Sequence, residues 1–270
     1  MAAVVTGSDI ERGLVALGLR GESVVAHASL RSFGQVDGGA ATVAVAFTTS
    51  FRTLLMPAFN WGEGSALVGP PPGETLEHNA VDQGFLASLP RSPRPFDRAR
   101  TPVHPAMGAV PRALHAMPGT VRSEHPVASW LAHGVESALL LDDQPWDDPH
   151  LPLRRLGELS GWLLLCGVGL KACTALHVAE EHAGRHGFVR WVVRADGSTA
   201  RVRVGGCSDG FDQLWPRLRE LFRVEQVGGA TLAAAPLVAV VDRATEVFRS
   251  EPELSRCSPT CLRCRDARVS

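Results

Sequence analysis

A histidine with carboxylates one helical turn later stands near position 177. His177 precedes Glu180 and Glu181 by three and four residues, a spacing that brings side chains onto one face of a helix. Thr174 stands where the N-cap of that helix would be, so the imidazole falls in the first turn. The positive end of the helix dipole disfavours imidazolium there, and a neutral imidazole can accept a proton. The pattern predicts a general base that either carboxylate can orient.

The segment before this helix supports a catalytic role for His177. One histidine among ten more often serves packing or the surface than catalysis. Here, however, residues 163–166 form an apolar run typical of a buried strand, and Gly167-Val168-Gly169 makes a turn after it. Because α/β proteins build sites at the carboxyl ends of their strands, this position favours a catalytic role.

A second candidate segment follows the apolar run at residues 24–26. Small and polar residues come after it, and Gly38-Gly39 opens a helix, which leaves backbone N–H groups able to face an anion. Arg31 adds a positive charge. An ordinary turn is the alternative, since neither glycine-rich nucleotide motif is present. The Gly-x-Ser-x-Gly elbow of serine hydrolases does not occur either.

Three of the six cysteines cluster near the end of the sequence given. Cys257-x3-Cys261-x2-Cys264 matches the iron–sulfur motif of radical enzymes in spacing, but that loop lies early in a barrel, and here only six residues follow. A zinc site completed by a distant ligand, such as Cys207 or a histidine, fits better. An exposed tail without metal is the interpretation that we prefer to a zinc site. We expect no metal among the catalytic residues.

The composition is that of a globular protein and limits the partners. Hydrophobic residues make up 45% of the chain and charged residues 20%. A formal net charge of -1 argues against a nucleic-acid surface, which needs excess cations. No apolar stretch approaches the roughly 18 residues of a membrane span, and no secretory signal is visible, so we expect a cytoplasmic protein without a membrane partner.

Alternating strand and helix signals predict an α/β fold with some antiparallel pairing. We expect strands at 24–26, 53–56, 138–141 and 163–166, a hairpin of 188–194 and 199–204, and helices at 9–19, 39–47, 107–116, 127–133, 175–183, 211–222 and 236–249. Two long irregular segments are expected to shape a site. The predicted organisation is one domain over residues 1–250 with loop insertions at 62–105 and 142–153, followed by a cysteine-containing tail over 251–270.

In their order along the chain, these motifs resemble the antibiotic N-acetyltransferase family typified by the aminoglycoside 3-N-acetyltransferases. The resemblance covers about residues 9 to 250. It rests on His27 through Ala40, Leu55 through Phe59, Phe96-Asp97 with Thr101-Pro102, Arg122 through Ser129, and Leu163 through Glu180.

The resemblance implies a mixed sheet flanked by helices, unlike the Gcn5-type fold, in a monomer or homodimer. It implies acetyl-coenzyme A as co-substrate, no metal in catalysis, and direct transfer to the 3-amino group of the 2-deoxystreptamine ring of an aminoglycoside, which confers resistance. The implied catalytic residues are His177, Glu180 and Thr174. The residues implied to contact coenzyme A are Ser29, Leu30, Arg31, Ser32, Gly34, Val36, Thr101, Arg122, Ser123, His125 and Ser129.

The acceptor is the least determined part of this expectation. Where the family pattern has Gly-x-x-Ser-Pro-Leu, the chain reads Asp147 through Leu153, and the usual Asp-His reads Asp143-Gln144. The alternatives are acetylation of another small-molecule amine, thioester hydrolysis, and a non-catalytic protein that binds a small molecule or zinc. Acidic side chains that can bind a polycationic aminoglycoside are Glu63, Glu77, Asp142, Asp143 and Asp209.

Overall fold

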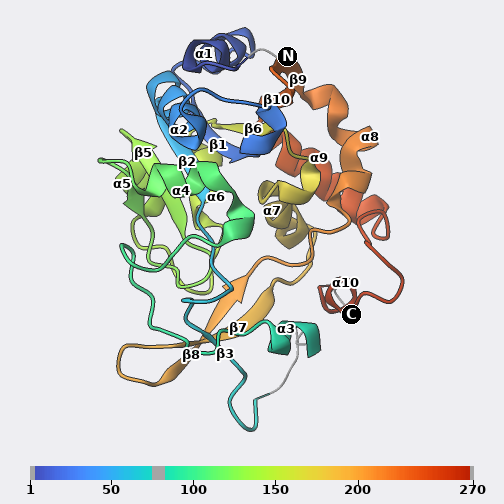
Figure 1. Cartoon of the computed structure of the whole chain (residues 1–270). Helices are drawn as coiled ribbons and strands as arrows, with labels where there is room; N and C mark the ends of the chain where they lie inside the picture. The colour runs from blue at the N-terminus through green and yellow to red at the C-terminus, as the bar shows by residue number, and fades with distance from the viewer. Residues whose placement is uncertain (1–3, 75–82, 268–270) are drawn as a thin grey trace.

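A mixed seven-stranded sheet forms the centre of the protein in the computed structural model, which describes residues 4–74 and 83–267 (Figure 1). The strand order is β4-β5-β2-β1-β6-β10-β9. β1 runs parallel to β2 and β6, and the remaining pairs are antiparallel. The strands are β1 (Ser23–Ala28), β2 (Thr53–Pro57), β4 (Val121–Arg122), β5 (Trp130–Gly134), β6 (Trp162–Cys166), β9 (Arg223–Val227) and β10 (Ala230–Pro236).

Helices cover both faces of this sheet. Successive side chains of a strand point to opposite faces, so Val24 joins a core with α1, α2 and α4, while Val25 joins a second core with α5, α6, α7 and α9. The predicted mixed sheet flanked by helices is therefore confirmed. The helices are α1 (Gly7–Ala16), α2 (Gly39–Ser50), α4 (Ala109–His115), α5 (Ser137–Leu141), α6 (Leu151–Glu158), α7 (Ala175–His182), α8 (Trp215–Leu218) and α9 (Leu237–Ser250).

A smaller antiparallel sheet, in the order β3-β7-β8, lies beneath the main one in Figure 1. The hairpin predicted around Asp196-Gly197 is present, and Gly197 takes the positive φ of +82° that its turn requires. β3 comes from the long irregular segment 62–105 and pairs with β7, which anchors that segment. The elements are β3 (Leu67–Val68), β7 (Phe188–Val193), β8 (Thr199–Val204) and, nearby, α3 (Gln83–Ala87).

Short elements complete the chain. The 3-10 helices are η1 (Leu30–Phe33), η2 (Pro105–Met107), η3 (Leu170–Ala172), η4 (Phe211–Leu214) and η5 (Arg219–Leu221), and α10 (Leu262–Asp266) lies near the C-terminus. Over the described residues, none of the helices has both the length and the apolar character to cross a membrane.

Several predicted elements were wrong. The helix predicted at 127–133 is the strand β5, whose run is apolar because both of its faces are covered. The strand predicted at 138–141 lies in α5, where Leu140 is buried and Leu139 is exposed, as on an amphipathic turn. The β9–β10 hairpin, turning at Gly228-Gly229, was not predicted, and α6 begins at Leu151 inside a segment expected to be irregular.

Candidate active site

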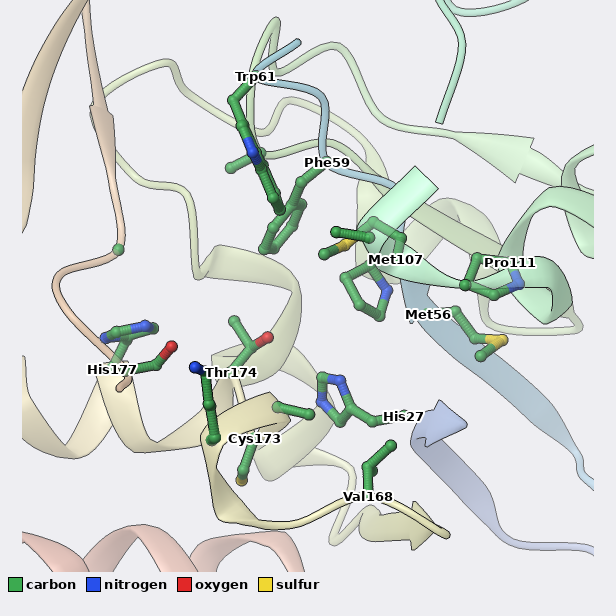
Figure 2. A pocket seen from close by; sticks show the side chains of 18 of the residues that line it. His27, Met56, Phe59, Trp61, Met107, Pro111, Val168, Cys173, Thr174 and His177 are labelled. Atoms are coloured by element: carbon green, nitrogen blue, oxygen red, sulfur yellow. The ribbon is translucent and has the colours of Figure 1, made fainter. Parts of the chain in front are cut away.

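A cleft of about 1490 Å³ lies where the parallel strands β1, β2 and β6 end (Figure 2). The segments that follow these strands line one side of it, and β7 and β8 contribute Phe188, Arg190 and Val204. This edge of an α/β sheet is where such proteins place ligands, because the loops after several strands converge there. His177, on α7, is among the lining residues.

His177 is paired with Glu180. The Nδ1 atom lies 2.8 Å from Glu180 Oε2, and both side chains are buried. Arg185 donates to the other carboxylate oxygen at 3.0 Å and to Ser255 Oγ at 2.7 Å, which fixes the carboxylate in turn. An ionised carboxylate only accepts hydrogen bonds, so this contact assigns the proton of the neutral ring to Nδ1 and leaves the Nε2 lone pair available.

Packing holds the His177 ring from two other sides. The centroid of the Phe211 ring lies 4.9 Å from that of the imidazole. The backbone of Gly205 approaches so closely that a Cβ atom there would come within 2.7 Å of His177 Cδ2. A glycine at this position is therefore needed for the imidazole to keep its place.

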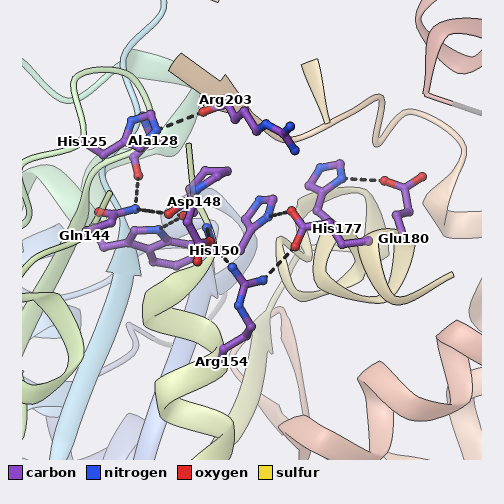
Figure 3. A network of polar contacts seen from close by, with 12 residues as sticks. His125, Ala128, Gln144, Asp148, His150, Arg154, His177, Glu180 and Arg203 are labelled. Atoms are coloured by element: carbon purple, nitrogen blue, oxygen red, sulfur yellow. Dashed lines mark hydrogen bonds and ion pairs between the residues drawn. The ribbon is translucent and has the colours of Figure 1, made fainter. Parts of the chain in front are cut away.

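A second histidine–carboxylate pair lies beside the first (Figure 3). His150 Nδ1 is 2.7 Å from Glu181 Oε1, and Arg154 donates to Glu181 Oε2 at 2.7 Å. Burial opposes ionisation of Glu181, but the hydrogen bond from His150 and the hydrogen bond and charge of Arg154 lower its pKa to about 2. Burial lowers the pKa of His150. The rings of His150 and His177 stack with centroids 5.6 Å apart.

The sequence left open which of the two carboxylates contacts His177, and the structure shows the contact. Glu180 contacts His177, whereas Glu181 turns to His150 and Arg154. Residues three and four apart both lie near one helix face, but α7 directs them to different imidazoles.

Thr174 takes the predicted N-cap position of α7, but its hydroxyl makes no capping hydrogen bond and its backbone is already helical. Its side chain lines the cleft close to His177 in Figure 2. The neighbouring Cys173 lines the cleft as well, and burial raises the pKa of its thiol to about 12. The thiol is therefore protonated at neutral pH and is not a nucleophile.

Four of the residues expected to contact coenzyme A line the cleft. They are Ser29, Leu30, Arg31 and Gly34. Arg31 is exposed, and Gly34 has a φ of +85°, so its backbone takes a conformation that favours glycine. Ser32 instead donates through Oγ to the carbonyl oxygen of Gly167 at 2.7 Å, and Val36 pairs with Val5.

The other five residues expected to contact coenzyme A form hydrogen bonds away from the cleft lining. They are Thr101, Arg122, Ser123, His125 and Ser129. The buried Arg122 donates to Ser129 Oγ at 2.9 Å and to the Ala58 carbonyl at 2.7 Å. His125 Nδ1 accepts the N–H groups of Val127 and Ala128. The network holds the loop after β2 and the start of β5, so it positions the cleft wall; direct contact with coenzyme A stays a prediction for these five.

The cleft lining carries charges of both signs, and the part near η3 and η4 includes Lys171 and Arg263 as well as acidic residues. Arg31 and Arg112 line the cleft near the loop after β1, whereas Asp209 and Asp212 line it near η3 and η4. Lys171 pairs with Asp209 at 2.6 Å. Of the other acidic candidates, Glu63, Asp142 and Asp143 are not among the lining residues, and Glu77 lies outside the described part of the chain.

A sequence profile described as aminoglycoside 3-N-acetyltransferase matches residues 25–249, well over half of the chain. The chain belongs to this family. It is therefore a member of a family of acyltransferase enzymes. The match spans the cleft-lining loops after β1, β2 and β6 and both histidine–carboxylate pairs.

Relatives of this acetyltransferase come from Streptomyces and Serratia. Aminoglycoside N(3)-acetyltransferase VIII of Streptomyces fradiae is 35% identical over 80% of this chain and 71% of its own length. The type VII enzyme of Streptomyces paromomycinus is 35% identical over 68% of this chain, and the match spans 62% of that relative. The type III enzyme of Serratia marcescens is 33% identical over 71% of this chain and 75% of its own length.

Solved structures share the fold. The apoenzyme of aminoglycoside acetyltransferase AAC(3)-IVa superposes with a TM-score of 0.79 at 25% identity, covering 99% of this chain and 98% of that one. A histidine-to-alanine mutant of that enzyme in complex with a gentamicin gives a TM-score of 0.77 at 26% identity and the same coverage. AAC-IIIb in a binary complex with CoASH matches at 22% identity, with a TM-score of 0.74, over 92% of this acetyltransferase and 97% of AAC-IIIb.

Sequence reasoning missed two features of the acetyltransferase cleft. His150 lies in the segment noted only as a departure from the family pattern, and its partner Glu181 is 31 residues away, so no local spacing relates them. Asp212 follows Phe211 at the start of η4 and reaches the cleft only through tertiary packing. Its Oδ1 accepts the backbone N–H of Lys171 at 2.9 Å.

Proposed function

We propose that this protein transfers the acetyl group of acetyl-coenzyme A to the 3-amino group of an aminoglycoside, with His177 as general base. The observation that carries the proposal is the buried His177–Glu180 pair on the wall of the cleft, with Nε2 left as acceptor. The CoASH complex of AAC-IIIb and the gentamicin complex of AAC(3)-IVa support the two substrates.

The proposed reaction is a direct transfer. The neutral substrate amine attacks the thioester carbonyl carbon, a C–N bond forms, and the amine proton passes to His177 Nε2. The C–S bond then breaks, and the coenzyme A thiolate takes up the proton held by His177, which returns the imidazole to its neutral form. Glu180 stabilises the positive charge that the imidazole carries between these steps, and Arg185 keeps the carboxylate in place.

Two neighbours of His177 have distinct parts in this proposal. The Thr174 hydroxyl, which lines the cleft, donates to the carbonyl oxygen as negative charge develops on it. The buried Cys173 thiol does not form an acyl-enzyme, because burial raises its pKa to about 12. This agrees with the proposed single transfer, in which no acyl group is carried by Cys173.

We place coenzyme A along the loop after β1 and the acceptor near η4. Arg31 and Arg112 supply positive charge for the phosphates of coenzyme A. Ser29 and Gly34 supply neighbouring backbone groups for contact with coenzyme A. A polycationic acceptor fits the part of the cleft lined by Asp212, which is exposed and for which no ion pair is found among the described residues.

The test is acetyl-coenzyme A-dependent thiol release with a panel of acceptors. Gentamicin-, neomycin- and apramycin-like aminoglycosides are compared with simple primary amines, and mass spectrometry with NMR locates the acetyl group. We expect amine-dependent release and modification at the 3-amino position. Thiol release with none of the aminoglycosides refutes the proposal. Thiol release only with another amine assigns the chain the alternative acceptor that its altered segment 147–153 favours.

A further inference from the structure

Four cysteines from distant parts of the sequence converge beside the cleft wall. The sulfur atoms of Cys207, Cys257, Cys261 and Cys264 all lie within 4.8 Å of one another. The Sγ of Cys257 is 3.9 Å from that of Cys207 and 3.5 Å from that of Cys264. Cys207 follows β8, whereas the other three belong to the tail that contains α10.

These distances fit a tetrahedral thiolate site for one ion. Zinc binds cysteine sulfur at about 2.3 Å, so four sulfurs around it lie about 3.8 Å apart, between the two separations given above. We propose that Cys207, Cys257, Cys261 and Cys264 hold a structural zinc ion. All four positions of the tetrahedron are then filled by protein, which is typical of a structural rather than a catalytic zinc site.

Backbone hydrogen bonds around the sulfurs support a metal-binding arrangement. The N–H of Asp209 faces Cys207, and the N–H of Cys264 faces Cys261 across the Cys-x-x-Cys turn. Such donors stabilise the charge of metal-bound thiolates. Arg263 on α10 pairs with Asp209 and adds positive charge next to the four sulfurs.

Two other uses of the four thiols fit less well. A disulfide needs sulfurs about 2.05 Å apart, and all four cysteines are free. An iron–sulfur cluster contains several iron and sulfide atoms, which hold the ligating sulfurs further apart than a single ion does. One mononuclear ion matches the size of the space between the four sulfurs.

The zinc ion would tie the tail to the wall that supports His177. Cys207 directly follows Gly205-Gly206, whose backbone packs against the imidazole of His177 and the carboxylate of Glu180. Arg263, between two of the tail ligands, also lines the cleft. This role is structural and does not depend on which acceptor the enzyme uses.

The first test is the metal content of the full-length protein, purified without a metal-affinity tag. Elemental analysis should find about one zinc per chain in the wild type. Cys261→Ser removes one ligand from the half-exposed tail and should reduce zinc at least tenfold. Cys166→Ala is the matched control, because it removes a thiol in β6 outside the cluster and should leave zinc unchanged.

A second readout needs no variant. Titration of the wild type with a mercurial thiol reagent, in the presence of a chromophoric zinc chelator, should release about one zinc as four thiols react. Substitution with cobalt should give the visible absorption of a tetrahedral thiolate site. Wild-type protein without zinc, iron in its place, disulfide-bonded cysteines in the intact mass, or zinc retained by Cys261→Ser would each overturn the proposal.

Discussion

Replacing Glu180 by glutamine removes one charge from the His177 pair while keeping the shape of the side chain. In the wild type, the ionised carboxylate accepts a 2.8 Å hydrogen bond from Nδ1 inside a buried site. A hydrogen bond to a charged group contributes about 1.5 to 3 kcal/mol. Because this contact strengthens when the ring becomes charged, we expect Glu180→Gln to lower kcat by about 10- to 150-fold.

The KM values separate a positioning role from a general loss of structure. Glu180 contacts His177 and Arg185, not the loop that we assign to coenzyme A, so the KM for acetyl-coenzyme A should stay within about twofold. The variant leaves the buried Arg185 without its carboxylate, so thermal unfolding must be recorded alongside the kinetics. Glu181→Gln is the matched control, because it removes the carboxylate of the second pair.

The assay is steady-state thiol release with saturating acceptor, repeated with Glu180→Asp. Aspartate keeps the charge and should recover part of the lost kcat. If the contact were purely structural, the kcat of Glu180→Asp would not exceed that of Glu180→Gln. A folded Glu180→Gln enzyme with wild-type kcat would refute the assignment of this carboxylate to His177 in the reaction.

Three further outcomes follow from the cleft. Gly205→Ala places a methyl group within 2.7 Å of the His177 ring, and displacement of the imidazole should lower kcat by up to about 100-fold in the thiol-release assay. A Gly205→Ala enzyme with wild-type kcat contradicts the packing described. Asp212→Asn should raise the acceptor KM about fivefold, as loss of about 1 kcal/mol predicts, without changing the KM for acetyl-coenzyme A; an unchanged acceptor KM removes Asp212 from the binding site. Burial lowers the pKa of His27 from 6.5 to about 4, so the unfolded chain binds the extra proton and stability falls as the pH drops through this range. Urea unfolding measures this effect. Between pH 6.5 and pH 4, the free energy of unfolding of His27→Leu should fall by about 3 kcal/mol less than that of the wild type. An equal fall in both proteins refutes the buried neutral ring.

The elements nearest the site were the most predictable from the sequence. The apolar run of β6, the glycine turn and the start of α7 are local signals, and all three place His177 correctly. β5 and α5 were exchanged, since a short apolar run carries no clear period and only pairing with β2 decides its state.

Contacts between distant segments were beyond local patterns. The split of Glu180 and Glu181 between two imidazoles depends on α7 and also on His150, which stands just before α6 and is distant in sequence. The cysteine spacing left both a zinc site and a tail without metal open, and Cys207 was named only as one option for a fourth ligand. Its approach to the tail requires the fold of the segment after β8.

The most direct test of His177 as general base is a single-turnover measurement of acetyl transfer by His177→Ala. Acetyl-coenzyme A and an aminoglycoside are mixed with excess enzyme, and binding of acetyl-coenzyme A is measured separately to show that the cleft is intact. General-base catalysis predicts a transfer rate about 100- to 10,000-fold below the wild type with unchanged cofactor affinity. A folded variant that transfers the acetyl group at a near wild-type rate would contradict the mechanism.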